Sequence, residues 1–129
     1  LVVVNRTPEK AEQLLADVLA AADSDPFLLA ATPDDPDLPA LLAESSLIIN
    51  ATSLGWHGDE TPLADDLIPA DALVFDMVYR QTRLLREAAA RGARTLDGSH
   101  MLVRQAALAF ERWTGRTAPL DVMRAAMRA

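Results

Sequence analysis

The chain has 129 residues, enough for one domain with a modest core, and its composition is 50% apolar and 24% charged. The formal net charge of −7 argues against a nucleic-acid-binding protein, which needs a broad basic face, and against attraction to anionic membranes. There is no cysteine, no apolar run near the roughly 20 residues that span a bilayer, and no His/carboxylate pair at ligand spacing. We therefore expect no disulfide framework, no partner among nucleic acids or membranes, and no metal site.

The first predicted element is a buried strand at residues 1–4, where four apolar side chains follow one another. A helix follows, with Thr7 as its N-cap and Pro8 at its first position, and the DSDP segment ends it. Apolar residues at helical spacing give this helix one face toward a core, namely Ala11, Leu14, Leu15, Val18, Leu19 and Ala22.

The middle of the chain predicts two strands around a short helix. Residues 27–30 form a strand, an acidic proline-rich loop leads into a helix at 40–44, and residues 47–50 form a buried strand. The ATSLGWHGDETPL segment reads as a loop, and residues 73–79 form the third buried strand.

The last third of the chain is mostly helical. A helix over residues 82–91 ends with Gly92 at the C′ position, and residues 94–97 form a short strand. A long helix at 98–114 and a terminal one at 120–128 complete the chain. The buried stripe predicted for the long helix consists of Met101, Leu102, Leu108, Ala109 and Trp113, with Gln105 on the same stripe.

Strands alternate with helices, and the better strands are apolar on both faces. This pattern favours a parallel sheet covered by helices on both sides, an α/β domain.

Two cations follow the first predicted strand. In an open parallel sheet, ligands bind beyond the carboxyl ends of the strands; Arg6 lies at such an end and Lys10 in the next helical turn. Arginine suits phosphate oxygens, and the helix N-terminus adds backbone N–H groups. In a dinucleotide fold an arginine here accommodates the 2′-phosphate of NADP, and no acid occupies residues 5–7. The alternative is a pair of solvated surface cations.

The NATSLG segment comes directly after the strand at 47–50. Small and hydroxyl residues let a ligand approach the backbone closely, and Asn50, Thr52 and Ser53 offer hydrogen bonds. The same residues also favour an ordinary turn, so this segment is either part of a binding site or a plain loop.

Polar residues also interrupt two apolar elements. Asp76 lies inside an apolar strand, and a buried acid needs a partner or belongs to a site. Tyr79, at the end of that strand, would hold its hydroxyl over a ligand crevice; the alternative is a core Met77 and a rim tyrosine. Gln105 must pair inside the protein or reach a ligand, and Gly98 lets another group come close to the backbone.

Taken together, four motifs resemble the C-terminal half of shikimate dehydrogenase, in the family's order. They are NRT with a cation at Lys10, then NATSLG, then FDMVY, then DG…MLVRQAALAFERWTG, which is the most specific. The match runs over nearly the whole chain. It implies a Rossmann-like fold and NADPH-dependent reduction of 3-dehydroshikimate to shikimate, in aromatic amino-acid biosynthesis, with a cytoplasmic location.

The resemblance also implies roles for individual residues. The 2′-phosphate end of NADP would be held by Asn5, Arg6, Thr7 and Lys10. The cofactor groove and the nicotinamide would be lined by Thr52, Ser53, Met77, Gly98 and Met101. The substrate, shikimate or 3-dehydroshikimate, would contact Tyr79 and Gln105. His100 departs from the small residue often found there, which puts the packing around the nicotinamide in doubt.

In the family, a substrate domain with a catalytic lysine and aspartate, a strand, a glycine-rich loop and a helix precede the position of Leu1. We therefore expect a fragment without catalytic residues of its own, inactive by itself. In the strand order 3-2-1-4-5-6, residues 1–4 and 47–50 would be strands 2 and 4. Both would face a gap with open edges and exposed apolar faces, which would allow self-association.

We expect residues 1–115 to form this partial NADP-binding domain and residues 116–129 a helix that packs toward the substrate domain. Two other functions remain open. One is a quinate/shikimate dehydrogenase paralogue that uses NAD, and the other is a non-catalytic nucleotide-binding or interaction module.

Overall fold

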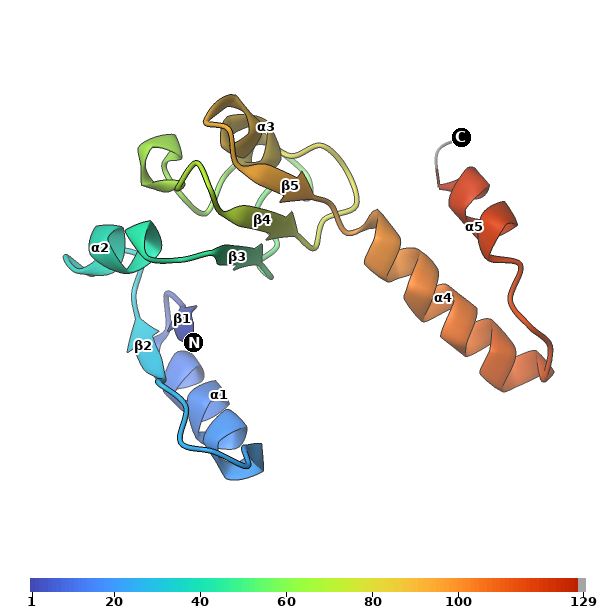
Figure 1. The fold of residues 1–129 in the computed structure, drawn as a ribbon, viewed down its shortest axis with the longest axis horizontal. Helices are drawn as coiled ribbons and strands as arrows, with labels where there is room; N and C mark the ends of the chain where they lie inside the picture. The colour runs from blue at the N-terminus through green and yellow to red at the C-terminus, as the bar shows by residue number, and fades with distance from the viewer. Residues whose placement is uncertain (128–129) are drawn as a thin grey trace. The chain divides into compact units, whose positions relative to one another are not determined.

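Short strands and helices alternate along residues 1–127, the part of the chain that this computed structural model describes (Figure 1). The strands form two parallel sheets, one of two strands and one of three. The chain divides accordingly into two compact units, Leu1–Glu44 and a second that begins at Ser45. The α/β class and the parallel pairing expected from the sequence are confirmed.

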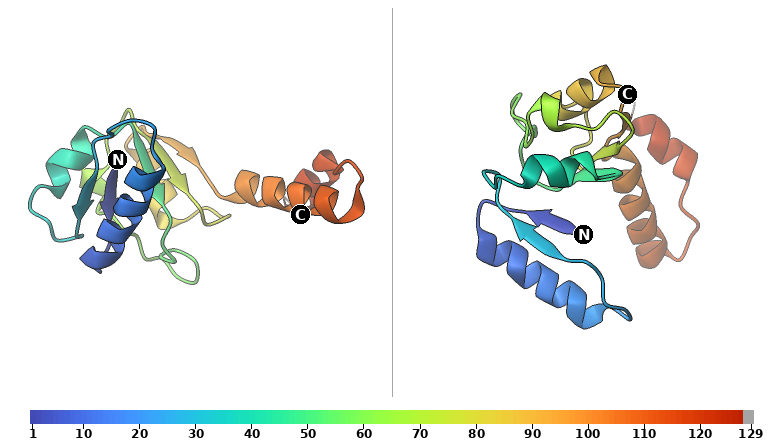
Figure 2. Two further views of the ribbon diagram at one scale, coloured as in Figure 1. Left: turned by 90° about the horizontal axis from the view of Figure 1, so that it is seen from below. Right: turned by 60° about the vertical axis from the view of Figure 1, so that its left-hand side comes forward.

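The first unit consists of two strands, one long helix and one short one. Its elements are β1 (Val2–Val4), α1 (Pro8–Ala21), β2 (Leu29–Ala31) and α2 (Leu38–Ala43). Helix α1 lies along the β1–β2 pair (Figure 2). Thr7 precedes it in an extended conformation, but its side chain makes no capping hydrogen bond; instead, the Asn5 Oδ1 accepts the Thr7 N–H at 2.9 Å.

The predicted core face of α1 is only partly buried. Ala11 and Leu15 are buried, as expected, but Leu14 and Leu19 are each 49% exposed. Two short strands offer a narrow surface, so within this unit only the centre of the apolar stripe finds neighbours.

The second unit begins with a three-stranded sheet. Its strands are β3 (Leu47–Asn50), β4 (Leu73–Asp76) and β5 (Arg94–Leu96), with a 3₁₀ turn η1 (Asp65–Leu67) between the first two. Helix α3 (Arg83–Ala90) packs against β4 and β5. The buried core under this helix comprises Ile68, Val74, Leu84, Leu85, Ala88 and Ala93. Gly92 follows α3 with φ +91°, as its predicted C′ position requires.

Strand β4 ends three residues earlier than predicted. The sequence favours a strand to Tyr79, yet the ladder stops at Asp76. The reason is local, because the Val78 N–H turns back to the Asp76 carboxylate at 3.0 Å instead of continuing the sheet.

Helix α4 (Ser99–Thr114) and helix α5 (Leu120–Ala126) pack against each other. The buried stripe predicted for α4 is wrong: Val103 and Ala107 are its buried residues, whereas Leu108 is 68% and Trp113 82% exposed. The other members of the predicted stripe, Met101, Leu102 and Ala109, are half-buried. Residue 128, the predicted end of the last helix, lies outside the described residues.

The two sheets correspond to the two ends of the strand order 3-2-1-4-5-6, one to strands 3 and 2 and the other to strands 4, 5 and 6. Strand β1 pairs with β2, and β3 with β4 and then β5, all in parallel. Within the described residues β1 and β3 each pair along one edge only. On β3, Leu47 and Ile49 are 51% and 54% exposed, which agrees with the apolar surface expected beside an open edge.

No helix among residues 1–127 has the length and apolar character needed to cross a membrane.

Candidate functional site

Strands β3, β4 and β5 run in parallel, so the segments that follow them start from the same edge of the sheet. Backbone hydrogen bonds tie these segments together. The Met77 N–H donates to the Asn50 carbonyl at 3.0 Å, and the Gly98 N–H donates to the Val78 carbonyl at 3.1 Å. Three motifs that lie far apart in the sequence therefore meet at this carboxyl edge.

A buried carboxylate lies at the centre of this edge. Asp76 is fully buried, and its Oδ1 accepts both the Asn50 side-chain amide and the Val78 N–H at 3.0 Å. Its Oδ2 accepts the Thr82 hydroxyl at 2.6 Å. The sequence predicted a partner or a site for this acid, and the structure supplies three partners from two strand ends and a helix N-cap.

Asn50 extends this network into the following loop. Its Oδ1 accepts the Thr52 N–H at 3.0 Å and the Thr52 hydroxyl at 2.7 Å. The Thr52 oxygen in turn accepts the Leu54 N–H at 3.1 Å, and the Asn50 amide also reaches the Leu54 carbonyl at 3.3 Å. The hydroxyl proton of Thr52 is thus used inside the loop. Ser53 is exposed, and its carbonyl accepts the Trp56 N–H at 3.1 Å.

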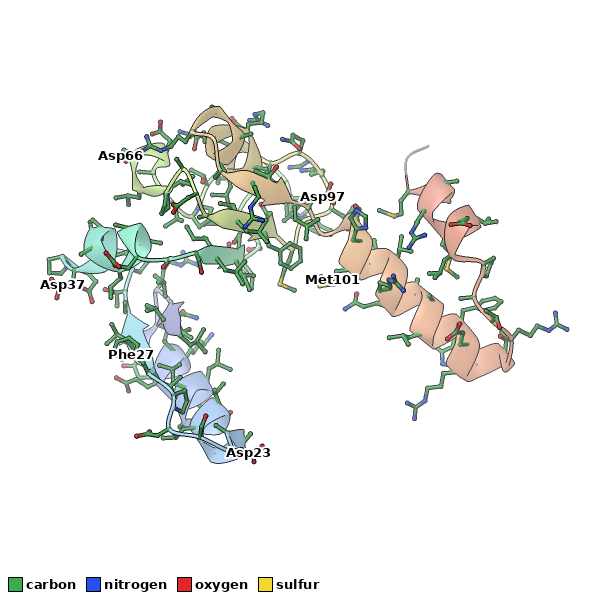
Figure 3. All side chains as sticks on the ribbon, viewed as in Figure 1. Asp23, Phe27, Asp37, Asp66, Asp97 and Met101 are labelled. Atoms are coloured by element: carbon green, nitrogen blue, oxygen red, sulfur yellow. The ribbon has the colours of Figure 1, made fainter. Side chains whose placement is uncertain are left out.

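Gly98 lies directly against the end of β4. A Cβ atom at this position would stand 2.0 Å from the Met77 carbonyl oxygen, so no other residue fits. Asp97 and Met101 lie on either side of this junction, Met101 in the first turn of α4 (Figure 3). The sequence expected a close backbone approach at Gly98, and the neighbour is the chain itself.

Tyr79 stands beside an aromatic residue of the loop after β3. The rings of Trp56 and Tyr79 meet edge to face, with centroids 5.0 Å apart, and both side chains are partly exposed. The Arg80 guanidinium holds this loop, because it donates to the Gly55 carbonyl at 2.6 and 3.0 Å and to the Gly58 carbonyl at 3.1 Å.

A cavity of about 430 Å³ adjoins Tyr79. Polar and charged groups line much of it, among them Asp97, His100, Arg104 and Arg124. Gln105, one helical turn beyond Met101, is exposed and makes no side-chain hydrogen bond within the part of the chain that the structure describes. Of the two alternatives that the sequence left open for Gln105, the internal partner is therefore not found among these residues.

The cations Arg6 and Lys10 belong to the first unit. Arg6 follows β1 and Lys10 lies in the first turn of α1, both exposed. Neither side chain has an ion-pair or hydrogen-bond partner among residues 1–127. Glu9, in the same turn, also makes no ion pair there, so these three side chains together leave a positive charge at the start of α1.

Sequence reasoning missed the roles of Trp56 and Arg80. Nothing in the local pattern marks Arg80, because its acceptors are carbonyls more than twenty residues away. An aromatic residue in an otherwise polar loop is a signal that could have singled out Trp56. Among the described residues, no cluster of three or more His, Asp or Glu side chains could hold a metal ion.

Comparison with known proteins gives a consistent result. A family model described as the shikimate 5′-dehydrogenase C-terminal domain matches residues 98–128. A curated shikimate dehydrogenase (NADP(+)) from Symbiobacterium thermophilum is 47% identical over 131 residues, which cover 98% of this chain and 44% of that protein.

Solved structures agree in fold. The shikimate 5-dehydrogenase from Thermus thermophilus, in complex with NADP(H) and shikimate, is 37% identical with a TM-score of 0.77 over 98% of this chain and 44% of that one. Quinate dehydrogenase from Corynebacterium glutamicum, in complex with NAD, is 31% identical with a TM-score of 0.81 over 96% of this chain and 44% of that one. The chain thus spans a little under half the length of the relatives it matches.

Proposed function

Because this chain belongs to the shikimate dehydrogenase family by sequence and by fold, we propose that it forms the cofactor-binding part of an NADP-dependent shikimate dehydrogenase. The reaction is the reversible reduction of 3-dehydroshikimate to shikimate, in the cytoplasm. The observation that carries the proposal is the 47% identity, over 98% of the chain, with a curated enzyme of that name.

The residues of the chain fit a dinucleotide with an extra phosphate. Two cations without a protein partner among residues 1–127 lie at the N-terminal end of α1, where backbone N–H groups favour an anion. The carboxyl edge of the β3–β4–β5 sheet carries Gly98, whose lack of a side chain keeps the junction between β5 and α4 close to Met77. We assign the 2′-phosphate end to residues 5–7 and Lys10, and the nicotinamide end to this carboxyl edge.

The proposed task of the chain is orientation. NADPH supplies the hydride when it is bound, and the protein must hold the nicotinamide against the substrate carbonyl. We assign one side of the nicotinamide to Met77, Gly98 and Met101, and the groove leading to it to Thr52 and Ser53. Tyr79 and Gln105 are assigned to the substrate, which they would orient by hydrogen bonds from hydroxyl and amide groups.

Proton transfer is assigned to groups outside this chain. Asp76 is buried and its carboxylate is fully engaged, so it is not free to act as a general acid. Asp97, which lines the cavity beside Tyr79 together with His100, accepts the Ser99 N–H and hydroxyl. We therefore propose that residues 1–129 alone do not turn over substrate.

The second candidate is a quinate-type enzyme that uses NAD, favoured by the fold similarity to quinate dehydrogenase. The charge at the end of β1 favours the first candidate, because Arg6 and Lys10 suit a phosphate and residues 5–7 contain no acid for the ribose hydroxyls of NAD.

The test is a matrix of four assays on the intact protein that carries this chain: shikimate or quinate, each with NADP or NAD. We expect the highest kcat/KM for shikimate with NADP. A preference for quinate with NAD would establish the second candidate, and no oxidation of either substrate would contradict both. Residues 1–129 expressed alone should show no turnover, and turnover by them would overturn the assignment of proton transfer to another part.

A further inference from the structure

We propose that Asp76 is a positioning residue: its buried carboxylate fixes the two loops that face the cofactor and the substrate. The inference deepens the proposed function and rests on it. Asp76 itself touches neither ligand in this assignment, since it is fully buried, and it acts through Asn50, Val78 and Thr82.

Packing alone does not explain an acid at this position. Val74 lies two residues earlier on the same face of β4, is equally buried, and belongs to the apolar core under α3. A carboxylate is costly to bury, and within the described residues Asp76 has no cationic partner. Its three hydrogen bonds, at 2.6 to 3.0 Å, are what offsets that cost.

The hydrogen bonds lead to both loops of the proposed site. Through Asn50 the carboxylate is connected to Thr52 and so to the loop after β3. Through the Val78 N–H it sets the turn that carries Met77 and Tyr79, and the Val78 carbonyl in turn accepts the Gly98 N–H. One oxygen, Oδ1, receives a bond from each of the two loops.

Thr82 holds the carboxylate from the other side. Its hydroxyl donates to Asp76 Oδ2, while its oxygen accepts the Leu85 N–H at 3.4 Å as the N-cap of α3. Thr82 is buried, and we assign none of its atoms to a ligand. Its methyl group lies beside Gly55 of the loop after β3. Thr82→Val keeps that methyl group and removes the hydroxyl, so it perturbs the carboxylate while the contact with this loop is kept.

Substitutions at two positions test the inference in the intact protein. Asp76→Asn keeps the shape, but it places an amide opposite the Thr82 hydroxyl. Thr82→Val removes the hydroxyl, whereas Thr82→Ser keeps it and serves as the conservative rescue. We expect kcat for shikimate oxidation to fall tenfold or more in D76N and about tenfold in T82V, and to return to within threefold of wild type in T82S.

The expected pattern is a split between turnover and cofactor affinity. The Kd for NADP, measured by calorimetry, should stay within threefold of wild type in these variants, because we assign most of that affinity to the 2′-phosphate end in the other unit. Val74→Ala is the control for a purely structural effect. It opens a cavity in the same strand and should lower Tm without lowering kcat of the folded protein below half.

The outcomes separate the two levels of the proposal. If wild type oxidises shikimate with NADP and the Asp76 and Thr82 variants keep its kcat, the positioning role is wrong. The role is also wrong if V74A loses as much kcat as the Asp76 and Thr82 variants when their losses of Tm are equal. If the wild-type protein itself does not oxidise shikimate, the proposed function fails instead. Should D76N not fold, the T82V and T82S pair decides the question by itself.

Discussion

Gly98 and Met77 lie so close that a Cβ atom on residue 98 would stand 2.0 Å from the Met77 carbonyl oxygen. The φ angle of Gly98 is −73°, an ordinary value for any residue. Glycine is therefore needed here for space and not for conformation. The contact joins the end of β4 to the start of α4, the two segments to which we assign the nicotinamide.

Gly98→Ala should destabilise the protein by about 3 kcal/mol or more, because the obstructing atoms belong to the backbone and cannot turn away. Gly115→Ala is the matched control. Gly115 has φ +68° and open space around it, so alanine there should cost about 1 kcal/mol of backbone strain. Chemical denaturation of the intact protein compares the two. Equal losses in the free energy of unfolding would show that the backbone moves to relieve the contact at residue 98, which would contradict the prediction.

Arg6→Ala should weaken NADPH binding about 10- to 100-fold, the range expected for losing a charge-assisted hydrogen bond, and leave NADH binding nearly unchanged. Lys10→Ala should act in the same direction with a smaller effect. The exposed Arg116, in the other unit, provides the control variant R116A, which should change neither affinity. Calorimetric Kd values decide, and equal losses for both cofactors would remove the 2′-phosphate role.

Trp56→Ala should raise the KM for shikimate about three- to tenfold, because Tyr79 loses an edge-to-face contact of roughly 0.5–1.5 kcal/mol. Trp56→Phe keeps an aromatic edge and should stay closer to wild type. The chain has two tryptophans, and Trp113 is 82% exposed, so W113F is a suitable control with no expected effect. An unchanged KM in W56A would show that Trp56 does not contribute to substrate binding.

Arg80→Met should loosen the loop that carries Trp56, since three hydrogen bonds to the Gly55 and Gly58 carbonyls disappear. The expected loss of stability is about 1–3 kcal/mol, with faster amide exchange confined to residues 53–60. Arg83 pairs with Glu87 on the exposed side of α3, so R83M should change exchange in that loop little. Mass-spectrometric hydrogen exchange that is the same in R80M and R83M would contradict this.

The pKa of Asp34 lies below its usual value. The larger cause is a hydrogen bond from the Thr32 side chain, and the smaller one is a hydrogen bond from the backbone. Thr32→Val should raise that pKa again, and Thr32→Ser should keep it low. A depressed folded-state pKa adds stability above the unfolded-state value, and the contribution is lost as the pH falls through the folded pKa. Wild type should therefore be more sensitive than T32V to acid below about pH 4. An NMR titration of the Asp34 carboxyl carbon measures the shift directly.

The regular elements of this chain could be predicted because their signals are local. Four apolar residues mark β1, Pro8 opens α1, and Gly92 closes α3. The predicted stripe of α4 failed because an apolar face alone does not say which neighbour covers it. Leu108 and Trp113 remain exposed within residues 1–127.

The site was predictable as a set of strand ends and not as a set of contacts. Parallel pairing places the NATSLG and FDMVY motifs at one edge, which the sequence could anticipate from topology. That Asn50 bonds Asp76 depends on their facing each other across the β3–β4 ladder, 26 residues apart in sequence. The roles assigned to Thr52, Met77, Gly98 and Gln105 stay predictions.

The shared oxygen of Asp76 gives spectroscopists a natural reporter. Val78 and Asn50 donate to the same oxygen. A movement of the loop after β3 therefore changes the electron density on that oxygen, and the Val78 amide proton senses the change. The NMR resonance of the Val78 amide proton should therefore respond to a movement of the loop at Thr52, without any engineered label.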